Sequence, residues 1–224
     1  SIYHEQALHM QIVGEDLQTF AHIHPMHISP GGIYFFQHQF PKAGRYAINI
    51  DYVVNGRELS KVFYITVEGK DTMQARSGLS SLLHMQPTQT KVFNGYQVTF
   101  SAPNNIKAGE KIKLHYTIEK DGKPVKNLEP YLSAAMHIAL VRQDLGKFSH
   151  THGEANLPGS VWFQQLLGAY FKYHIHFAPD SFGPKLITQP WTTIFPTPGT
   201  YTVFGEFKHE GKIIVTDFTV EVSE

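Results

Sequence analysis

The chain of 224 residues contains no cysteine. This absence excludes disulfides, thiolate metal sites and cysteine nucleophiles. A blue-copper electron-transfer centre is excluded with them, because such a centre needs a cysteine ligand. The lack of cysteine fits a periplasmic protein but also many cytosolic ones, so it does not identify the compartment by itself.

An excess of charge of one sign is missing as well. Lys and Arg total 19, and so do Asp and Glu, which makes the formal net charge zero at pH 7. Because nucleic-acid binders usually carry a basic patch or stripe, we expect no nucleic-acid partner. No apolar run approaches the length of a membrane span. The chain begins without a signal segment, and we interpret it as a mature or truncated form.

Histidine, by contrast, is abundant, with 14 residues, and several of them belong to an internal repeat. Residues 9–24 return 128 positions later as residues 137–152, with three histidines, an Asp-Leu pair and a phenylalanine in the same places. A second block, 40–46, returns 155 positions later as 195–201. The second copy therefore carries 27 additional residues between its blocks (155 − 128). Such self-similarity predicts two related domains.

The secondary-structure pattern is that of an all-β protein. β-branched and aromatic residues alternate over 46–52 and 200–207, and turn residues recur at short intervals. Many short strands at this spacing predict antiparallel β-sandwiches. The only helical candidates are 72–83 and 161–170. We predict an abbreviated first β-domain over 1–69, a linker over 70–90, and a complete second β-sandwich over 91–224 that contains the 27-residue insert.

Pairs of the form His-x-His are the candidate metal ligands. Alternate residues of a strand point to the same face about 7 Å apart, so two such imidazoles can converge on one ion. His22/His24 and His150/His152 have this form, and a third pair lies in the insert at His174/His176.

His9 and His137 are the third histidine of each repeat. If the loop of each predicted hairpin is even-numbered, this histidine lies on the same face as its pair; an odd-numbered or bulged loop would place it on the other face. In the first case each hairpin supplies three imidazoles, and His174 or His176 could close a four-nitrogen site. Duplication kept the histidines while most positions around them diverged, which favours metal binding over a structural or pH-sensing role. The predicted ligands are His9, His22, His24, His137, His150, His152, His174 and His176.

Other residues of the two repeats are assigned structural roles. We expect Asp16 and Asp144 to bond the backbone of tight turns, with the next leucine packed inward. Phe20 and Phe148 are expected in the core. Hydrogen-bonding roles in the core or at the surface are expected for His4, His84, His115 and His209, while His27 and His38 stay undecided. The methionines that adjoin the histidines are either soft copper(I) ligands or ordinary core residues: Met10, Met26 and Met136.

The type of ligand narrows the choice of metal ion. Imidazole suits copper and zinc, and the affinity order peaks at copper, so copper is expected first and zinc next. A closed four-histidine site would store, carry or structurally use the ion, whereas three histidines with an open position would be catalytic. Glu154 and Asp180 are the acidic residues near the pairs, and neither is a specific candidate base. No Ser-His-Asp spacing, phosphate loop or dinucleotide fingerprint is present, and we predict no catalytic residue.

Four motifs of the second copy occur together in a known family. They are Asp-Gly-Lys-Pro-Val at 121–125, Pro-Tyr-Leu-Ser-Ala-Ala-Met-His at 130–137, Asp-Leu-x-x-Phe-x-His-x-His at 144–152 and Phe-Pro-x-Pro-Gly-x-Tyr at 195–201. With these motifs the chain resembles the bacterial YtkA-like/FixH-like extracytoplasmic domains over most of 91–224, and in core elements over 7–67. The resemblance implies immunoglobulin- or cupredoxin-like sandwiches in tandem, associated with heavy-metal and copper handling. The chain departs from the family at Gly153, where a proline often stands, and in its insert.

Three functions remain as alternatives. The first is a non-enzymatic periplasmic metal-binding protein that buffers, transports or delivers copper or zinc, with a periplasmic or membrane-associated protein as its partner. The second is a metal-dependent enzyme with an open three-histidine site. The third is an interaction module of a membrane-associated complex, in which the histidines are structural.

Overall fold

The computed structural model describes residues 8–29, 31–55, 57–73, 86–129, 131, 134–155, 185–188 and 193–224. In these ranges the chain forms strands and no α-helix, which confirms the predicted all-β class. The helical candidate 161–170 lies outside the described residues, as does 72–83 apart from Thr72 and Met73, which are not helical. Across the described ranges, no helix has the length and apolar character to span a membrane.

The chain divides into two compact units. Unit 1 comprises Ser1–Leu83 and Val141–Phe148, and unit 2 comprises His84–Leu140 and Ser149–Glu224. The sequence predicted a linker over 70–90, and strand β7 (Thr88–Phe93) begins within that range.

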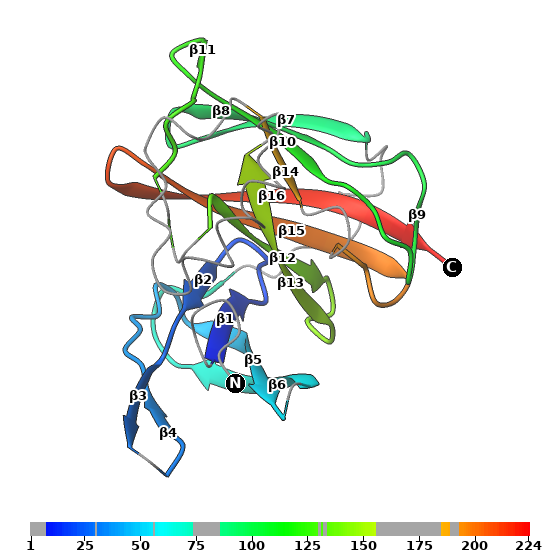
Figure 1. Cartoon of the computed structure of the whole chain (residues 1–224). Helices are drawn as coiled ribbons and strands as arrows, with labels where there is room; N and C mark the ends of the chain where they lie inside the picture. Colours follow the sequence, from blue (N-terminus) through cyan, green and yellow to red (C-terminus); the bar gives the residue numbers. More distant parts are fainter. Residues whose placement is uncertain are drawn as a thin grey trace, which may run out of the picture. The chain divides into compact units, whose positions relative to one another are not determined.

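Unit 1 contains a four-stranded antiparallel sheet in the order β2-β1-β5-β6 and a two-stranded sheet, β3-β4 (Figure 1). The strands are β1 (Leu8–Gly14), β2 (Phe20–Ile23), β3 (Met26–Ser29), β4 (Ile33–Phe35), β5 (Gly44–Val54) and β6 (Arg57–Val67). Met10 and Ile12 of β1 pack against Tyr46 and Ile48 of β5 in an apolar cluster. Because successive side chains of a strand alternate between faces, the residues between them on β1 point to the opposite face.

Unit 2 is built on a ten-stranded sheet in the order β7-β8-β10-β14-β13-β12-β15-β16-β9, with β11 paired to β10 (Figure 1). The remaining strands are β8 (Tyr96–Ser101), β9 (Ile106–Lys107), β10 (His115–Lys120), β11 (Lys123–Pro124), β12 (Met136–Arg142), β13 (Phe148–Ala155), β14 (Lys185–Thr188), β15 (Gly199–His209) and β16 (Lys212–Ser223).

The sheet of unit 2 folds over one apolar core. Phe100 of β8 stacks on Phe218 of β16, with ring centroids 4.9 Å apart. The Lys91 ammonium of β7 donates to the Asp217 carbonyl oxygen of β16 at 2.8 Å, although the two strands are far apart in the sheet order. Two antiparallel layers therefore enclose the core, which is the sandwich-like arrangement expected from the sequence.

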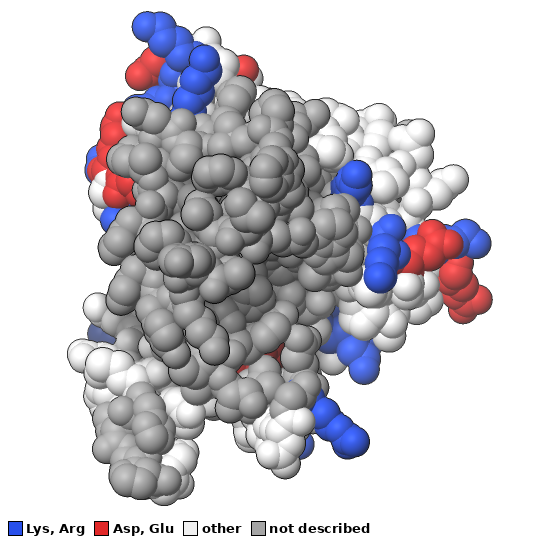
Figure 2. All heavy atoms as spheres, in the orientation of Figure 1, with Lys and Arg blue, Asp and Glu red and all other residues white. Residues whose placement is uncertain are grey.

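Charged side chains of both signs lie beside one another on the face drawn in Figure 2. Lys120 is paired with Glu210, and Lys208 with Glu129 at 2.9 Å. The pairing of opposite charges at the surface agrees with the net charge of zero.

Candidate metal centre

The β1–β2 hairpin determines where the first three histidines lie. Gln11 stands opposite His22, and Met10 stands opposite Ile23. The Gly14 amide donates to the Thr19 carbonyl oxygen at 2.9 Å, which closes a loop of four residues, 15–18. The loop is even-numbered, so the register places His9 on the same face as the histidine pair of β2.

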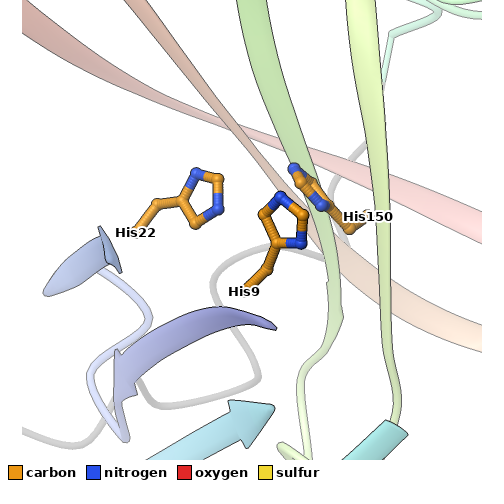
Figure 3. A group of neighbouring side chains, drawn as sticks. All are labelled: His9, His22 and His150. Atoms are coloured by element: carbon orange, nitrogen blue, oxygen red, sulfur yellow. The ribbon is translucent and has the colours of Figure 1, made fainter. Parts of the chain in front are cut away.

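The three imidazoles of unit 1 converge on that face. The ring centroid of His24 lies 4.5 Å from that of His9 and 5.1 Å from that of His22, and the His9 and His22 centroids are 5.7 Å apart. Figure 3 shows the rings of His9 and His22 projecting from the same side of their strands. The side chains of His9 and His22 are buried. We refer to His9, His22 and His24 as trio 1.

The β12–β13 hairpin of the second repeat is closed in the same way. The Arg142 amide donates to the Lys147 carbonyl oxygen at 3.0 Å, again across a loop of four residues. His137 on β12 and His150 and His152 on β13 form a second cluster, which we call trio 2. The residues that the repeat made equivalent in the sequence thus occupy equivalent places on the two hairpins.

Trio 2 has nearly the same internal geometry as trio 1. The His137 centroid lies 5.4 Å from that of His150 and 4.6 Å from that of His152, and the last two are 4.7 Å apart. One ring nitrogen from each of the three lies within 4.8 Å of the others. His137 and His152 are buried, and His150 is half-buried. Three imidazole nitrogens from the adjacent strands β12 and β13 therefore lie close together inside unit 2.

The hydrogen bonds of His137 define its protonation. Its Nε2 lies 2.9 Å from the Tyr131 carbonyl oxygen, which can only accept, so Nε2 carries the proton. The Nδ1 lone pair is then directed at Nε2 of His150, 3.1 Å away. A histidine whose other ring nitrogen donates to a backbone carbonyl is the usual form of a metal ligand, because this bond fixes both tautomer and ring orientation.

The turns that set this register are held by their aspartates, as predicted. The Asp16 Oδ1 accepts from the amides of Gln18 and Thr19 at 3.0 and 2.9 Å, and the Asp144 Oδ1 accepts from the Gly146 amide at 2.9 Å. The leucine that follows each aspartate has a positive φ, 52° at Leu17 and 60° at Leu145, and is buried. This conformation is unfavourable for leucine, and its burial offsets the cost.

Of the two alternatives for the methionines, the core role is the one that the structure shows for Met10 and Met136. Met10 and Met136 are buried within the apolar clusters of units 1 and 2, on the faces opposite His9 and His137. Met26 is 62% exposed on β3. The expected core positions of Phe20 and Phe148 also need correction, because both rings are only half-buried next to the hairpin turns.

Several histidines lie outside the two trios. His209 is buried, with Nδ1 2.8 Å from the Tyr96 hydroxyl and Nε2 3.1 Å from the Asn127 side-chain oxygen, which confirms its expected structural role. His38 packs edge-on against Phe40, and burial lowers its pKa. The proposed ligands His174 and His176 lie outside the described residues, as do His4 and His84, and the His27 side chain is not described.

Unit 2 also contains a buried acidic residue that was not among the predicted site residues. Glu206 on β15 is 3% exposed, and burial raises the pKa of its carboxyl group to about 8. It stands five positions beyond the repeated block 195–201, and Asp51 stands five positions beyond 40–46. Extending the alignment of the two blocks by those five residues would have revealed an acidic position common to both copies.

Comparison with known proteins places the chain in a family but does not supply an activity. No curated protein matches the sequence. A family model described as a domain of unknown function, DUF8832, matches residues 1–69 and 88–224. These ranges contain trio 1, trio 2 and both acidic positions. The chain belongs to the DUF8832 family.

Proposed function

We propose that the chain binds a divalent transition-metal ion, copper(II) or zinc(II), through trio 2, and that it buffers, carries or delivers this ion. The observation that supports the proposal most directly is the convergence of three imidazole nitrogens within 4.8 Å, inside the fold. Extracytoplasmic location is part of the proposal and rests on the resemblance to YtkA-like/FixH-like domains.

The geometry of trio 2 fits such an ion. Zinc–nitrogen bonds of about 2.0–2.1 Å in a tetrahedron separate neighbouring ligand nitrogens by roughly 3.3 Å. The His137 Nδ1 and the His150 Nε2 are 3.1 Å apart and share one proton. A metal ion that displaces this proton needs only a small movement of the two rings, while the Tyr131 carbonyl continues to hold His137.

Trio 1 extends the proposal to unit 1. In trio 1 the angle between ring planes is 28° for His9 and His22, 83° for His9 and His24, and 81° for His22 and His24. The equivalent angles in trio 2 are 17°, 87° and 73°. Two copies that diverged around their histidines have kept the same arrangement of imidazoles, which supports a shared chemical role rather than two unrelated packing solutions.

The available donors favour the oxidation state Cu(II) over Cu(I). Thiolate and thioether ligands select Cu(I), but the chain has no cysteine, and Met10 and Met136 face the apolar cores. Imidazole nitrogens suit Cu(II) and Zn(II). These two ions are therefore the ones to test.

The experiment is a metal titration of untagged protein after treatment with EDTA. We expect Zn(II) and Cu(II) to bind with micromolar or tighter affinity in calorimetry. The variant H137A/H150A/H152A should lose this binding, whereas H38A, which changes a half-buried histidine outside both trios, should keep it. The proposal is rejected if the wild-type protein titrates neither ion at micromolar affinity, or if the trio 2 variant binds as the wild type does.

The variant H9A/H22A/H24A tests separately whether trio 1 contributes to metal binding. We expect it to bind less metal per chain than the wild type. An unchanged metal content would remove trio 1 from the proposal. Circular dichroism of each variant shows whether the β-structure is retained, so that loss of binding is not confused with loss of folding.

A further inference from the structure

An acidic residue lies opposite the first histidine of trio 1. In the antiparallel pairing of β1 with β5, Asp51 is the direct partner of His9. Directly opposed residues project to the same face of a sheet, with Cβ atoms about 4.5–5.5 Å apart. Asp51 therefore stands on the histidine face of unit 1, where its Oδ1 accepts from the Asn49 side-chain amide at 2.9 Å.

The internal repeat contains an equivalent pair of residues in unit 2. The offset of 128 takes His9 to His137, and the offset of 155 takes Asp51 to Glu206. The strands that hold them are neighbours in both sheets, since β12 lies next to β15 as β1 lies next to β5. The two residues before the acid have diverged, from Asn49 and Ile50 to Phe204 and Gly205, so the acidic character was kept while its surroundings changed.

The packing of Gly205 shows independently which face Glu206 occupies. A Cβ atom built on Gly205 would collide with the Cε of Met136, so Gly205 and Met136 share the apolar face. Glu206 follows Gly205, and His137 follows Met136. Because faces alternate along each strand, Glu206 and His137 both point to the opposite face.

The side chains of Glu206 and His137 are 3% and 2% exposed, and Tyr131 packs beside His137. The Tyr131 ring centroid is 5.8 Å from that of His137, and its carbonyl oxygen accepts the His137 proton. Glu206 and His137 are therefore both buried on the face that they share.

We infer that Glu206 supplies a carboxylate oxygen to the ion held by trio 2, which makes the site a three-histidine, one-carboxylate centre for a divalent metal. This inference rests on the proposed function. In the part of the chain that the structure describes, the ligand atoms of His137, His150 and His152 lie within 4.8 Å of one another, and Glu206 is not a member of this group. The carboxylate therefore joins by a change of side-chain rotamer when the ion binds. An anionic oxygen favours Zn(II) and Cu(II) over Cu(I), and it lowers the net charge of the complex by one.

The test compares E206Q, which keeps the shape of the side chain but removes the anionic oxygen, with E206D, which keeps a carboxylate as in Asp51. The matched control is E110Q, which makes the same change at an exposed glutamate. Loss of an outer-shell partner alone typically costs about 10- to 100-fold in metal affinity, so we expect E206Q, which loses a direct ligand, to weaken Zn(II) binding by at least about 10-fold and E206D to recover part of the loss. In Cu(II)-loaded protein, the electron paramagnetic resonance spectrum of E206Q should change, while that of E110Q should not.

The possible outcomes separate this inference from the proposed function. Wild-type affinity and an unchanged Cu(II) spectrum in folded E206Q would overturn the role of Glu206 and leave trio 2 intact. Failure of the wild type to bind either ion would overturn both. If E206Q does not fold, E206D decides: a Cu(II) spectrum identical to that of the wild type would contradict coordination by this side chain, because the shorter carboxylate must change the ligand geometry.

Discussion

Buried histidines of unit 2 differ in what their ring nitrogens contact. Both nitrogens of His209 are within hydrogen-bond distance of side chains from other parts of the unit, Tyr96 and Asn127. His137 instead donates one proton to a backbone carbonyl and directs its second nitrogen at another imidazole. The first pattern is typical of a histidine that stabilises a fold, and the second is typical of the metal ligand that we propose His137 to be.

This difference predicts how replacement of His209 acts. H209A removes two hydrogen bonds and leaves a cavity in place of a ring that is 5% exposed, so we expect a loss of about 2–4 kcal/mol in the free energy of unfolding. Metal affinity should stay within a factor of two of the wild type. Urea unfolding and calorimetry measure the two quantities. The assignment fails if stability changes no more than in K126A, which alters an exposed side chain.

Residue by residue, the candidate site was only partly predictable from the sequence. The trio histidines repeat at fixed spacing, and this spacing made them visible as a set. Glu206 carries no local motif and lies on the face of His137 only because β15 pairs with β12, although the two residues are about 70 positions apart in the sequence. The methionines were ambiguous because sequence proximity to a histidine does not state which face of the strand a side chain occupies.

The decisive element is the hairpin with its four-residue loop. An even-numbered loop places His9, and likewise His137, on the same face of its hairpin as the His-x-His pair of the next strand. The sequence did not show whether the loop is even- or odd-numbered. Backbone hydrogen bonds close both loops after four residues, and the carboxylates of Asp16 and Asp144 hold the turns by accepting from backbone amides. The loops therefore contribute to the site, although no loop residue belongs to either trio.

The charge of Asp16 should make the stability of unit 1 depend on pH. Burial opposes its ionisation, but hydrogen bonds from Gln18, Thr19 and Lys42 outweigh burial, and the pKa of Asp16 lies below its ordinary value of 3.8. A carboxyl group with a depressed pKa in the folded state contributes stability above its unfolded pKa, and this stability is lost as the pH falls through the folded pKa.

We therefore expect D16N to be less stable than the wild type by about 1–2 kcal/mol at pH 6. The difference should shrink below pH 3.8 as Asp16 becomes protonated in the wild type. Urea unfolding monitored by circular dichroism between pH 2.5 and 7 measures it, in the range that remains folded. D121N, at an exposed turn, is the control. A difference that is constant across this range would contradict the role of the Asp16 charge.

At the scale of the whole molecule, metal binding and stability should be linked. An ion that binds the folded chain and not the unfolded one stabilises it by about 2.7 kcal/mol at a free concentration 100 times the dissociation constant. We expect Zn(II) to raise the midpoint of thermal unfolding of the wild type, and EDTA to reverse the shift. H137A/H150A/H152A should show a much smaller shift. A shift of equal size in that variant would indicate that the ion acts elsewhere on the chain.

The sequence by itself determined the all-β class, the repeat and the six histidines of the two trios. These features depend on local alternation and spacing, which are readable along the chain. Only the tertiary structure decided which side chains face the histidines, because that depends on loop parity and on the register between distant strands. The same register turned Met10 and Met136 into core residues and brought Glu206 to the face of His137.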